Sequence, residues 1–181
     1  MRRCQPGVPE WEEVYDSLTE TPDFDAPWML GEANMTDLIP RLAAQLPMTN
    51  AAIARHLRHN WHDIDWFPDA REWIHKLNGP ILQAIVTVNP FEISGIFTAC
   101  GLDPVVDVIV NSAEINTLSK VTMTEHARML LGLETGVGTS ILIDNREDNC
   151  EEFVAAGGVA IHFTPETFAA DAERLLSPLL A

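Results

Sequence analysis

Three polar side chains, a hydroxyl, an amine and a carboxylate, stand beside apolar segments in the second half of the sequence. Thr87 ends the segment A-I-V-T, Asp144 ends the segment I-L-I-D, and Lys120 stands just before a helical pattern. A lysine and a hydroxyl can together hold an oxyanion, and carboxylate oxygens are the ligands that a hard cation such as Mg²⁺ prefers. If the fold brings these groups together, we expect a site for an anion and a divalent cation.

The acidic stretch that follows the third segment has two interpretations. Glu147, Asp148, Glu151 and Glu152 all lie within eight positions of Asp144. Carboxylates at the start of a helix complement the helix dipole, and this is the favoured interpretation when the stretch is taken alone. The other polar groups shift the balance towards a cation site formed by the acids of this turn.

The elements that must position these groups alternate between strand and helix. We expect strands at residues 81–88, 105–110, 139–143 and 159–163, with helices at 90–100, 122–131 and 165–176. Repeated βα units predict a parallel, doubly wound sheet, and ligands of such sheets bind beyond the carboxyl ends of the strands. The polar residues expected at that edge are Thr87 and Asn89, Asn111 and Ser112, and Asp144 and Asn145.

The first third of the chain has a different pattern. Apolar residues recur at helical spacing from Trp11 to Leu18, and further helical patterns follow up to about residue 77. Near residue 80 the sequence pattern changes from helices alone to alternating strands and helices. We therefore divide the chain into a helical subdomain at residues 1–68 and an α/β core at residues 69–181.

Composition limits the classes of function. The net charge of −16 argues against nucleic acid or an anionic membrane as a partner, and no apolar run approaches the ~20 residues of a membrane helix. The three cysteines are widely spaced and form no C-x-x-C pair, and the N-terminus has no secretory signal. These features predict a reduced, cytoplasmic protein.

The order and spacing of the motifs resemble the haloacid dehalogenase-like (HAD-like) hydrolases with a helical cap. A-I-V-T-V-N-P is similar to the second motif of the family, Lys120 matches the lysine of the third, and I-L-I-D-N-R-E-D-N with G-G-V-A-I-H-F is similar to the fourth, metal-binding motif. Each short motif is weak alone, whereas their order, spacing and strand context together are specific. The resemblance covers nearly the whole chain from about Trp11.

The resemblance implies a three-layer, Rossmann-like parallel sheet with an N-terminal helical cap subdomain. It implies a magnesium-dependent, phosphatase-type hydrolase that acts on a small phosphorylated metabolite. Lys120, Thr87 and Asn89 would then be catalytic, and Asp144 and Asp148 would hold Mg²⁺. The substrate stays open. The choice between phosphatase and dehalogenase chemistry also stays open, because both reactions use attack by a carboxylate.

One departure from the family is serious. The family's nucleophile lies in an Asp-x-Asp motif at the end of a first strand upstream of the cap, and this sequence begins inside the cap-like region. Asp23 and Asp25 have the right spacing, but no strand pattern precedes them. Two hypotheses therefore stand: a hydrolase whose first motif is missing from this chain, with weak or absent Mg²⁺ binding, or a degenerate, non-catalytic binding or interaction protein.

The missing first strand has structural consequences. It lies centrally in the sheet of the family, so we expect either a gap or a replacement strand there, with an exposed apolar seam and a possible homodimer. We also expect Lys120 to form an ion pair with Asp144, because a lone lysine in that place would be desolvated without compensation.

Other residues that could do chemistry have simpler interpretations. His56, His59 and His62 are three positions apart, which spreads them around a helix instead of gathering them on a metal. Cys150, just inside a helix start, could have a lowered pKa, although a packing role is the default. His162, at a strand end, is expected to be packed or hydrogen-bonded.

Overall fold

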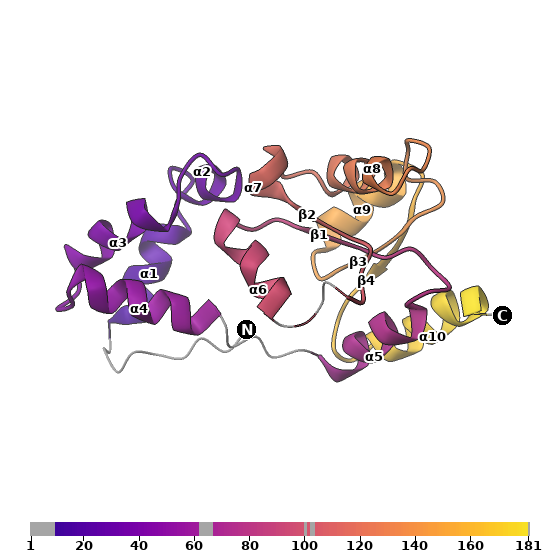
Figure 1. The fold of residues 1–181 in the computed structure, drawn as a ribbon, viewed down its shortest axis with the longest axis horizontal. Coiled ribbons are helices and arrows are strands. Elements are labelled where there is room, and N and C mark those ends of the chain that lie inside the picture. The colour runs from indigo at the N-terminus through magenta and orange to yellow at the C-terminus, as the bar shows by residue number, and fades with distance from the viewer. Residues whose placement is uncertain (1–9, 62–66, 100, 102–103, 181) are drawn as a thin grey trace. The chain divides into compact units, whose positions relative to one another are not determined.

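The computed structural model describes residues 10–61, 67–99, 101 and 104–180 (Figure 1). The chain forms two compact units. The first unit comprises Met1–Asp65, Val88–Cys100 and Asn111–Asn116, and the second comprises Trp66–Thr87, Gly101–Val110 and Thr117–Ala181. His62 and two of the three cysteines, Cys4 and Cys100, lie outside the described part.

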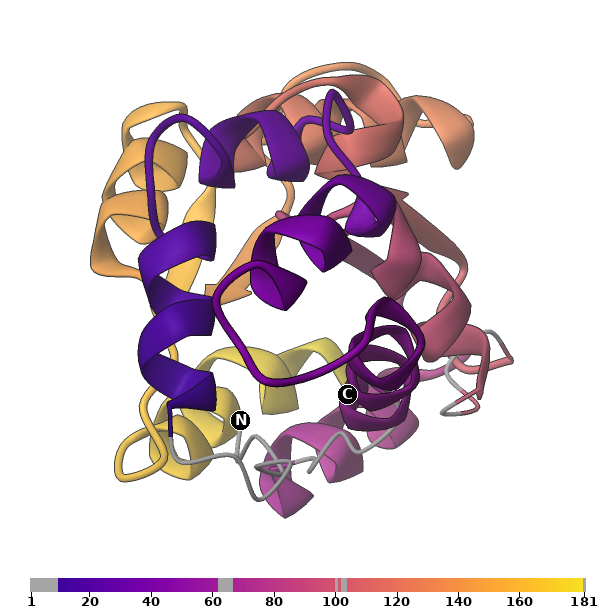
Figure 2. The ribbon, with the colours of Figure 1, turned by 90° about the vertical axis from the view of Figure 1, so that its left-hand side faces the viewer.

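The regular elements described in the first unit are helices, apart from Asn111 at the end of β2. Figure 2 shows its N-terminal helices in indigo and purple; the elements are α1 (Trp11–Thr19), α2 (Asp25–Met29), α3 (Met35–Ala43), α4 (Asn50–Trp61), η1 (Phe91–Ile93), α6 (Ser94–Ala99) and α7 (Ser112–Ile115). Trp11 and Tyr15 stack with ring centroids 5.8 Å apart, and both are buried with Leu38 and Ile53. The helical spacing expected from Trp11 onward is confirmed.

Residues 88–100 and 111–116 pack within the first unit, although the sequence pattern placed them with the α/β core. Ser112 Oγ donates to the carbonyl of Met29 at 2.6 Å, and the carboxylate of Glu92 accepts from the N–H of Met35 at 2.7 Å. Gly31 has a φ of +76°, and a Cβ there would lie 2.6 Å from the carbonyl oxygen of Ala113. Contacts so distant in sequence leave no periodic signal that could predict them.

The second unit alternates strands and helices, as predicted. Its elements are α5 (Pro68–Leu77), β1 (Ala84–Thr87), β2 (Val108–Asn111), α8 (Lys120–Leu130), β3 (Ile141–Asp144), α9 (Glu147–Ala155), β4 (Val159–His162), α10 (Phe168–Leu176) and η2 (Ser177–Leu180). The last residue of β2 is grouped with the first unit. In the described part of the chain, no helix has the length and apolar character needed to cross a membrane.

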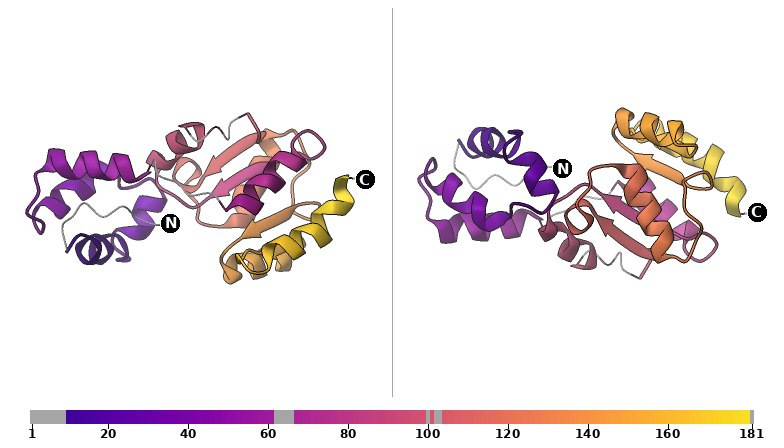
Figure 3. Two further views of the ribbon diagram at one scale, coloured as in Figure 1. Left: turned by 90° about the horizontal axis from the view of Figure 1, so that it is seen from below. Right: turned by 90° about the horizontal axis from the view of Figure 1, so that it is seen from above.

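Helices cover both faces of the strands in the second unit (Figures 1 and 3). On one face, Leu142 of β3 packs with Phe153 of α9 and Val137. On the other face, Ile161 of β4 packs with residues of α5 and α10, among them Trp73, Leu77, Phe168, Ala172 and Leu176. The predicted three-layer α/β architecture is therefore confirmed.

The strands form two separate pairs. β1 is bonded to β2, and β3 is bonded to β4 in parallel, with Ile141 opposite Val159 and Asp144 opposite His162. No described strand joins β1 to β3, so the four strands do not form one continuous sheet. Of the gap and the replacement strand that the sequence left open, the described strands show the gap.

Candidate functional site

Lys120 and Asp144 form a buried ion pair. Lys120 is the first residue of α8, whose N-terminus is capped by the hydroxyl of Ser119, and Asp144 is the last residue of β3. Lys120 Nζ lies 3.1 Å from Asp144 Oδ2, and the two side chains are 10% and 7% exposed. The ion pair expected from the sequence is confirmed.

The ammonium group of Lys120 also contacts β1. Nζ donates to the carbonyl oxygen of Val86 at 2.7 Å. A buried ammonium needs acceptors to offset its lost hydration, and here one comes from the end of β1 and one from the end of β3. Thr87 directly follows Val86 as the last residue of β1 and is half-buried. Lys120 therefore bridges the two strand pairs where β1 and β3 end.

The carboxylate of Asp144 has three donors around it. Oδ1 accepts from the N–H of Arg146 at 2.9 Å and from Asn149 Nδ2 at 3.0 Å, while Oδ2 faces Lys120. Burial raises the pKa of Asp144, but the hydrogen bonds from Asn149 and Arg146 and the charge of Lys120 together outweigh burial. The pKa of Asp144 therefore lies below its ordinary value, and the group is ionised at neutral pH.

Asp148, the second acid expected at the metal site, is engaged elsewhere. Its side chain is 63% exposed, and its carboxylate accepts from the guanidinium of Arg146. That hydrogen bond is the main cause that lowers the pKa of Asp148. Asn149, which the sequence analysis did not single out, is the α9 side chain that donates to the carboxylate of Asp144. The only available signal was its place in the first turn after a strand end.

The described residues do not by themselves fit a magnesium ion. Mg²⁺ requires near-octahedral oxygen ligands, whereas both oxygens of Asp144 already accept from nitrogen donors. Among the described residues, no group of three or more His, Cys, Asp or Glu side chains could hold a metal. Asp144 would have to exchange its present donors for the ion, and further oxygen ligands would have to join it.

Asn89 lies in the first unit, where its backbone is held by a serine. Its N–H donates to Ser112 Oγ at 3.0 Å, and the hydroxyl of Ser112 also lies 3.2 Å from its carbonyl oxygen. Asn111, whose side chain caps α7, donates to the carbonyl of Pro90. These bonds fix the backbone that follows β1 to the residues that follow β2.

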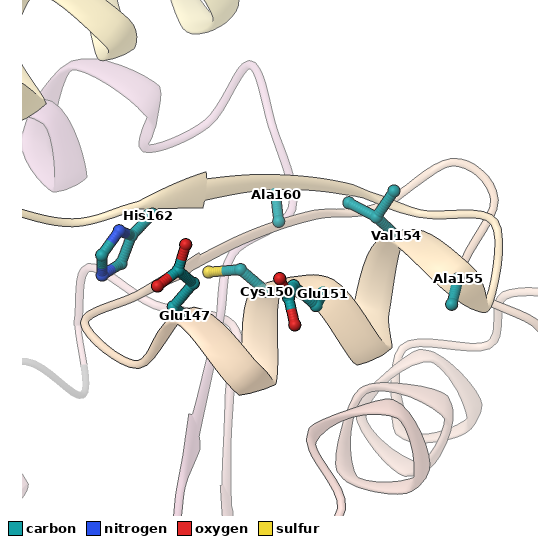
Figure 4. Close-up of a pocket in the computed structure, with 7 residues that line it drawn as sticks. All are labelled: Glu147, Cys150, Glu151, Val154, Ala155, Ala160 and His162. Atoms are coloured by element: carbon teal, nitrogen blue, oxygen red, sulfur yellow. The ribbon is translucent and has the colours of Figure 1, made fainter.

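An open hollow of about 470 Å³ lies over α9 and β4 (Figure 4). It is lined by Glu147, Cys150, Glu151, Val154, Ala155, Ala160 and His162, and it contains neither Lys120 nor Asp144. Burial raises the pKa of Cys150, which argues against the reactive, low-pKa interpretation, and the buried position of the side chain favours the packing role. His162 is exposed, and its Nε2 lies 3.2 Å from the carbonyl oxygen of Asn145.

The remaining candidates have structural roles. The ring of His56 packs edge-on against Trp11, with centroids 4.4 Å apart. Asp23 and Asp25 are exposed at the start of α2, and Phe24 between them is buried in the helical core. No strand delivers this D-x-D sequence, as the pattern around it predicted.

The lowered pKa of Asp144 predicts a pH-dependent contribution to stability. The contribution is present above the pKa of an unfolded aspartate, about 3.9, and is lost as the pH falls from there through the lower pKa of the folded state. We expect the difference in unfolding free energy between wild type and Asp144→Asn, measured by urea denaturation with a chelator present, to shrink as the pH falls from 6 to 3. If the difference in unfolding free energy between the two proteins does not change with pH, the pKa of Asp144 is not lowered by folding.

Comparison with known proteins gives a structural match. No protein-family model matches the sequence, and no curated protein is significantly similar to it. Among solved structures, 18 chains match significantly. One is the crystal structure of a HAD family enzyme from Bacteroides thetaiotaomicron, an aspartate-to-alanine mutant in complex with magnesium and inorganic phosphate. It matches with a TM-score of 0.63 and 10% sequence identity, covering 88% of this chain and 81% of the other.

At this level of identity the similarity concerns the fold. It agrees with the mixture of helices and strands and with the parallel pairing of β3 and β4. The chain therefore has the α/β fold of the HAD-like proteins.

Proposed function

We propose that this chain carries the phosphate-binding part of a phosphatase-type site that acts on a small, cytoplasmic phosphate monoester. The observation that supports the proposal is the buried pair of Lys120 and Asp144 at the ends of β1 and β3. A buried lysine at the carboxyl edge of parallel strands is well placed to neutralise an incoming phosphate oxygen. The solved structure with the same fold was obtained with magnesium and inorganic phosphate, which agrees with this proposal.

Each residue of the predicted set has a role in this proposal. Lys120 binds the phosphoryl oxygens, and the hydroxyl of Thr87 and the side chain of Asn89 donate hydrogen bonds to them. Asp144 and Asp148 would supply carboxylate oxygens for Mg²⁺ only if Asp144 gave up its present donors, Asp148 left Arg146, and further oxygen ligands joined them. Residues 1–68 correspond, in this proposal, to the helical cap-like subdomain expected from the sequence. Phosphate binding would require Lys120 to turn part of its hydrogen bonding from Val86 to the ligand.

The described strand ends lack a free carboxylate to act as nucleophile. β1, β2 and β4 end at Thr87, Asn111 and His162, and the carboxylate of Asp144 is paired with Lys120. Without a nucleophile the covalent step is lost, and loss of such a group typically lowers the rate by roughly 10⁴-fold or more. We therefore expect these 181 residues alone to bind phosphate but to hydrolyse phosphate esters at a negligible rate.

A non-catalytic binding protein is the second candidate. The observation that favours it is that Lys120 and both carboxylate oxygens of Asp144 already have hydrogen-bonding partners within the chain. Such an arrangement is stable without a ligand. The two candidates differ in turnover once the missing nucleophile is supplied.

Hydrolysis of p-nitrophenyl phosphate with Mg²⁺ tests the proposal. We expect background rates for the wild-type chain and for its Lys120→Ala and Asp144→Asn variants, and weaker binding of inorganic phosphate to Lys120→Ala in a calorimetric titration. Lys76→Ala is the matched control, because Lys76 is the other lysine of the chain and lies exposed beside Glu72 on α5.

Three outcomes would change the conclusion. Robust turnover that both site variants abolish would mean that the site is complete and that a nucleophile exists in this chain. Turnover that neither variant changes would assign the activity to another site. Phosphate binding that Lys120→Ala leaves equal to that of Lys76→Ala would contradict the phosphate-binding role of Lys120.

A further inference from the structure

The hollow over α9 and β4 has two ends of different character. Its residues on α9 recur at helical spacing, so a single face of this helix forms one wall. Figure 4 shows Glu147 and His162 at one end, Val154 and Ala155 at the other, and Glu151 between them. Among the described residues, no lysine or arginine lines the hollow. The surface is therefore acidic at one end and apolar at the other.

The two glutamates of the hollow repel each other without compensation. Within the described part of the chain, neither Glu147 nor Glu151 forms an ion pair. They stand four positions apart on α9, where like charges destabilise a helix. The helix dipole favours an acid in the first turn, which accounts for Glu147, but Glu151 lies one turn further along. A positive charge placed between the two carboxylates would relieve this repulsion.

The outer edge of β4, beside the hollow, is open among the described strands. The N–H groups of Val159 and Phe163 donate towards β3, at 3.1 and 2.7 Å. Backbone groups of successive strand residues alternate between the two edges, so those of Ala160 and His162 point outwards. The side chains of the same two residues line the hollow. Unpaired backbone groups and the acidic hollow therefore lie together on one edge of the second unit.

We propose that this edge is a docking site for an extended basic segment of another protein, which pairs with β4 and places a lysine or arginine beside Glu147 and Glu151. Backbone hydrogen bonds to Ala160 and His162 would supply affinity, and the side chains that enter the hollow would supply specificity. Two residues of the segment, separated by one position, would face α9: a basic one at the acidic end and an apolar one beside Val154.

Charge selects a foreign basic partner over the other possible occupants. The chain has 27 acidic and 11 basic residues, and its net charge of −16 repels a second copy of itself. The same charge attracts a basic segment and favours its encounter with the acidic hollow. The hollow contains neither Lys120 nor Asp144, so the proposal does not depend on the proposed function.

Amide hydrogen exchange followed by NMR tests the docking with the peptide Lys-Thr-Val-Thr-Lys, acetylated and amidated to remove its terminal charges. Its symmetric pattern offers a basic and an apolar side chain to the hollow in either strand direction. At a peptide concentration about ten times Kd, we expect exchange of the Ala160 and His162 amides to slow roughly tenfold. The amide of Ile161 points to β3 and should change little.

A double variant, Glu147→Gln with Glu151→Gln, tests the role of charge. We expect it to bind the peptide about threefold to tenfold more weakly than wild type in dilute buffer, and equally in 1 M salt, where charges are screened within about 3 Å. Glu134→Gln is the matched control, because Glu134 is an exposed acid in the loop after α8 of the same unit. Equal binding by the double variant and the control would overturn the role of the two glutamates.

Two control peptides separate strand pairing from simple attraction of charge. Lys-Pro-Pro-Pro-Lys keeps both lysines but lacks the three central backbone donors, so it should give no protection. Glu-Thr-Val-Thr-Glu keeps the backbone and reverses the charge, so it should bind at least about tenfold more weakly. Protection by the proline peptide would overturn strand pairing, and equal binding of the glutamate peptide would overturn the basic character of the partner.

Other patterns of protection would overturn the docking itself. Absence of protection at millimolar peptide excludes this edge as a docking site, and protection of Ala84 or Val86 in place of Ala160 assigns the peptide to β1. Protection of Ala160 that rises with protein concentration in the absence of peptide would identify a second copy of this chain as the occupant. Binding of inorganic phosphate, measured separately, tests the proposed function, and neither result decides the other.

Discussion

Replacement of Asp144 by leucine is expected to lower the free energy of unfolding by about 3–5 kcal/mol. The change would leave the ammonium of Lys120 buried, with the carbonyl of Val86 as its one acceptor among the described residues. A charge that loses its partner in a buried site keeps the full cost of its lost hydration. The N–H of Arg146 and the amide of Asn149 would lose their acceptor as well.

Replacement of Lys120 by methionine should cost less, about 1–3 kcal/mol. Asp144 would still accept hydrogen bonds from Arg146 and Asn149, which the remaining carboxylate needs. The asymmetry follows from the donors around the pair, because the aspartate has alternatives and the lysine has few.

Urea denaturation of both single variants and of the double variant measures these effects. The double variant replaces an ion pair by two apolar side chains. Its decrease in unfolding free energy should therefore be smaller than the sum of the decreases in the two single variants. Lys76→Met is the control for loss of a lysine on an exposed surface. If the losses of the single variants simply add, the pair is not coupled and its structural role is wrong.

Replacement of Phe153 by alanine is the second change with a large expected effect, about 3–5 kcal/mol. Phe153 is 0% exposed, lies on α9, and packs with Leu142 and Val137. Its ring also lies so close to Gly158 that a Cβ at that glycine would clash with it. The cavity left by alanine would therefore open between α9, β3 and the turn before β4.

Thermal and urea denaturation check this expectation. Val154→Ala is the matched control, because Val154 neighbours Phe153 on the same helix and is 55% exposed. We expect the control to lose a few tenths of a kcal/mol at most. The Phe153 variant should also loosen α9, which carries Asn149, so its phosphate binding should weaken with its stability. Equal stability of Phe153→Ala and Val154→Ala would mean that α9 does not cover the face of β3 with a buried core contact.

The sequence was informative about the site where strand ends determine position. Lys120 and Asp144 were predicted to pair because both flank strands that end at one edge, and an uncompensated lysine there is unfavourable; the structure confirms this. The gap in the sheet followed from the resemblance to a fold whose central strand has no match in this sequence. Both predictions depend on topology, which alternating patterns of residues encode well.

Details that depend on competition between nearby donors and acceptors were harder to predict. Thr122 has the spacing of a capping residue, yet α8 begins at Lys120, because the hydroxyl of Ser119 accepts from the N–H of Thr122. Arg146 engages Asp148 two positions away, and Asn149 contacts Asp144. A carboxylate, a guanidinium and an amide in one turn allow several pairings, and only their geometry selects one.

Each of the two units is built from separate stretches of the sequence, so neither unit can be exchanged as one continuous block. The chain passes between the units at five points, after residues 65, 87, 100, 110 and 116. Deletion of residues 1–65 would therefore leave Ser112 and Glu92 without Met29 and Met35, their partners within the first unit. Recombination could not exchange the helical unit by a single crossover, and any exchanged version would have to bring compatible residues in three separate stretches of the gene.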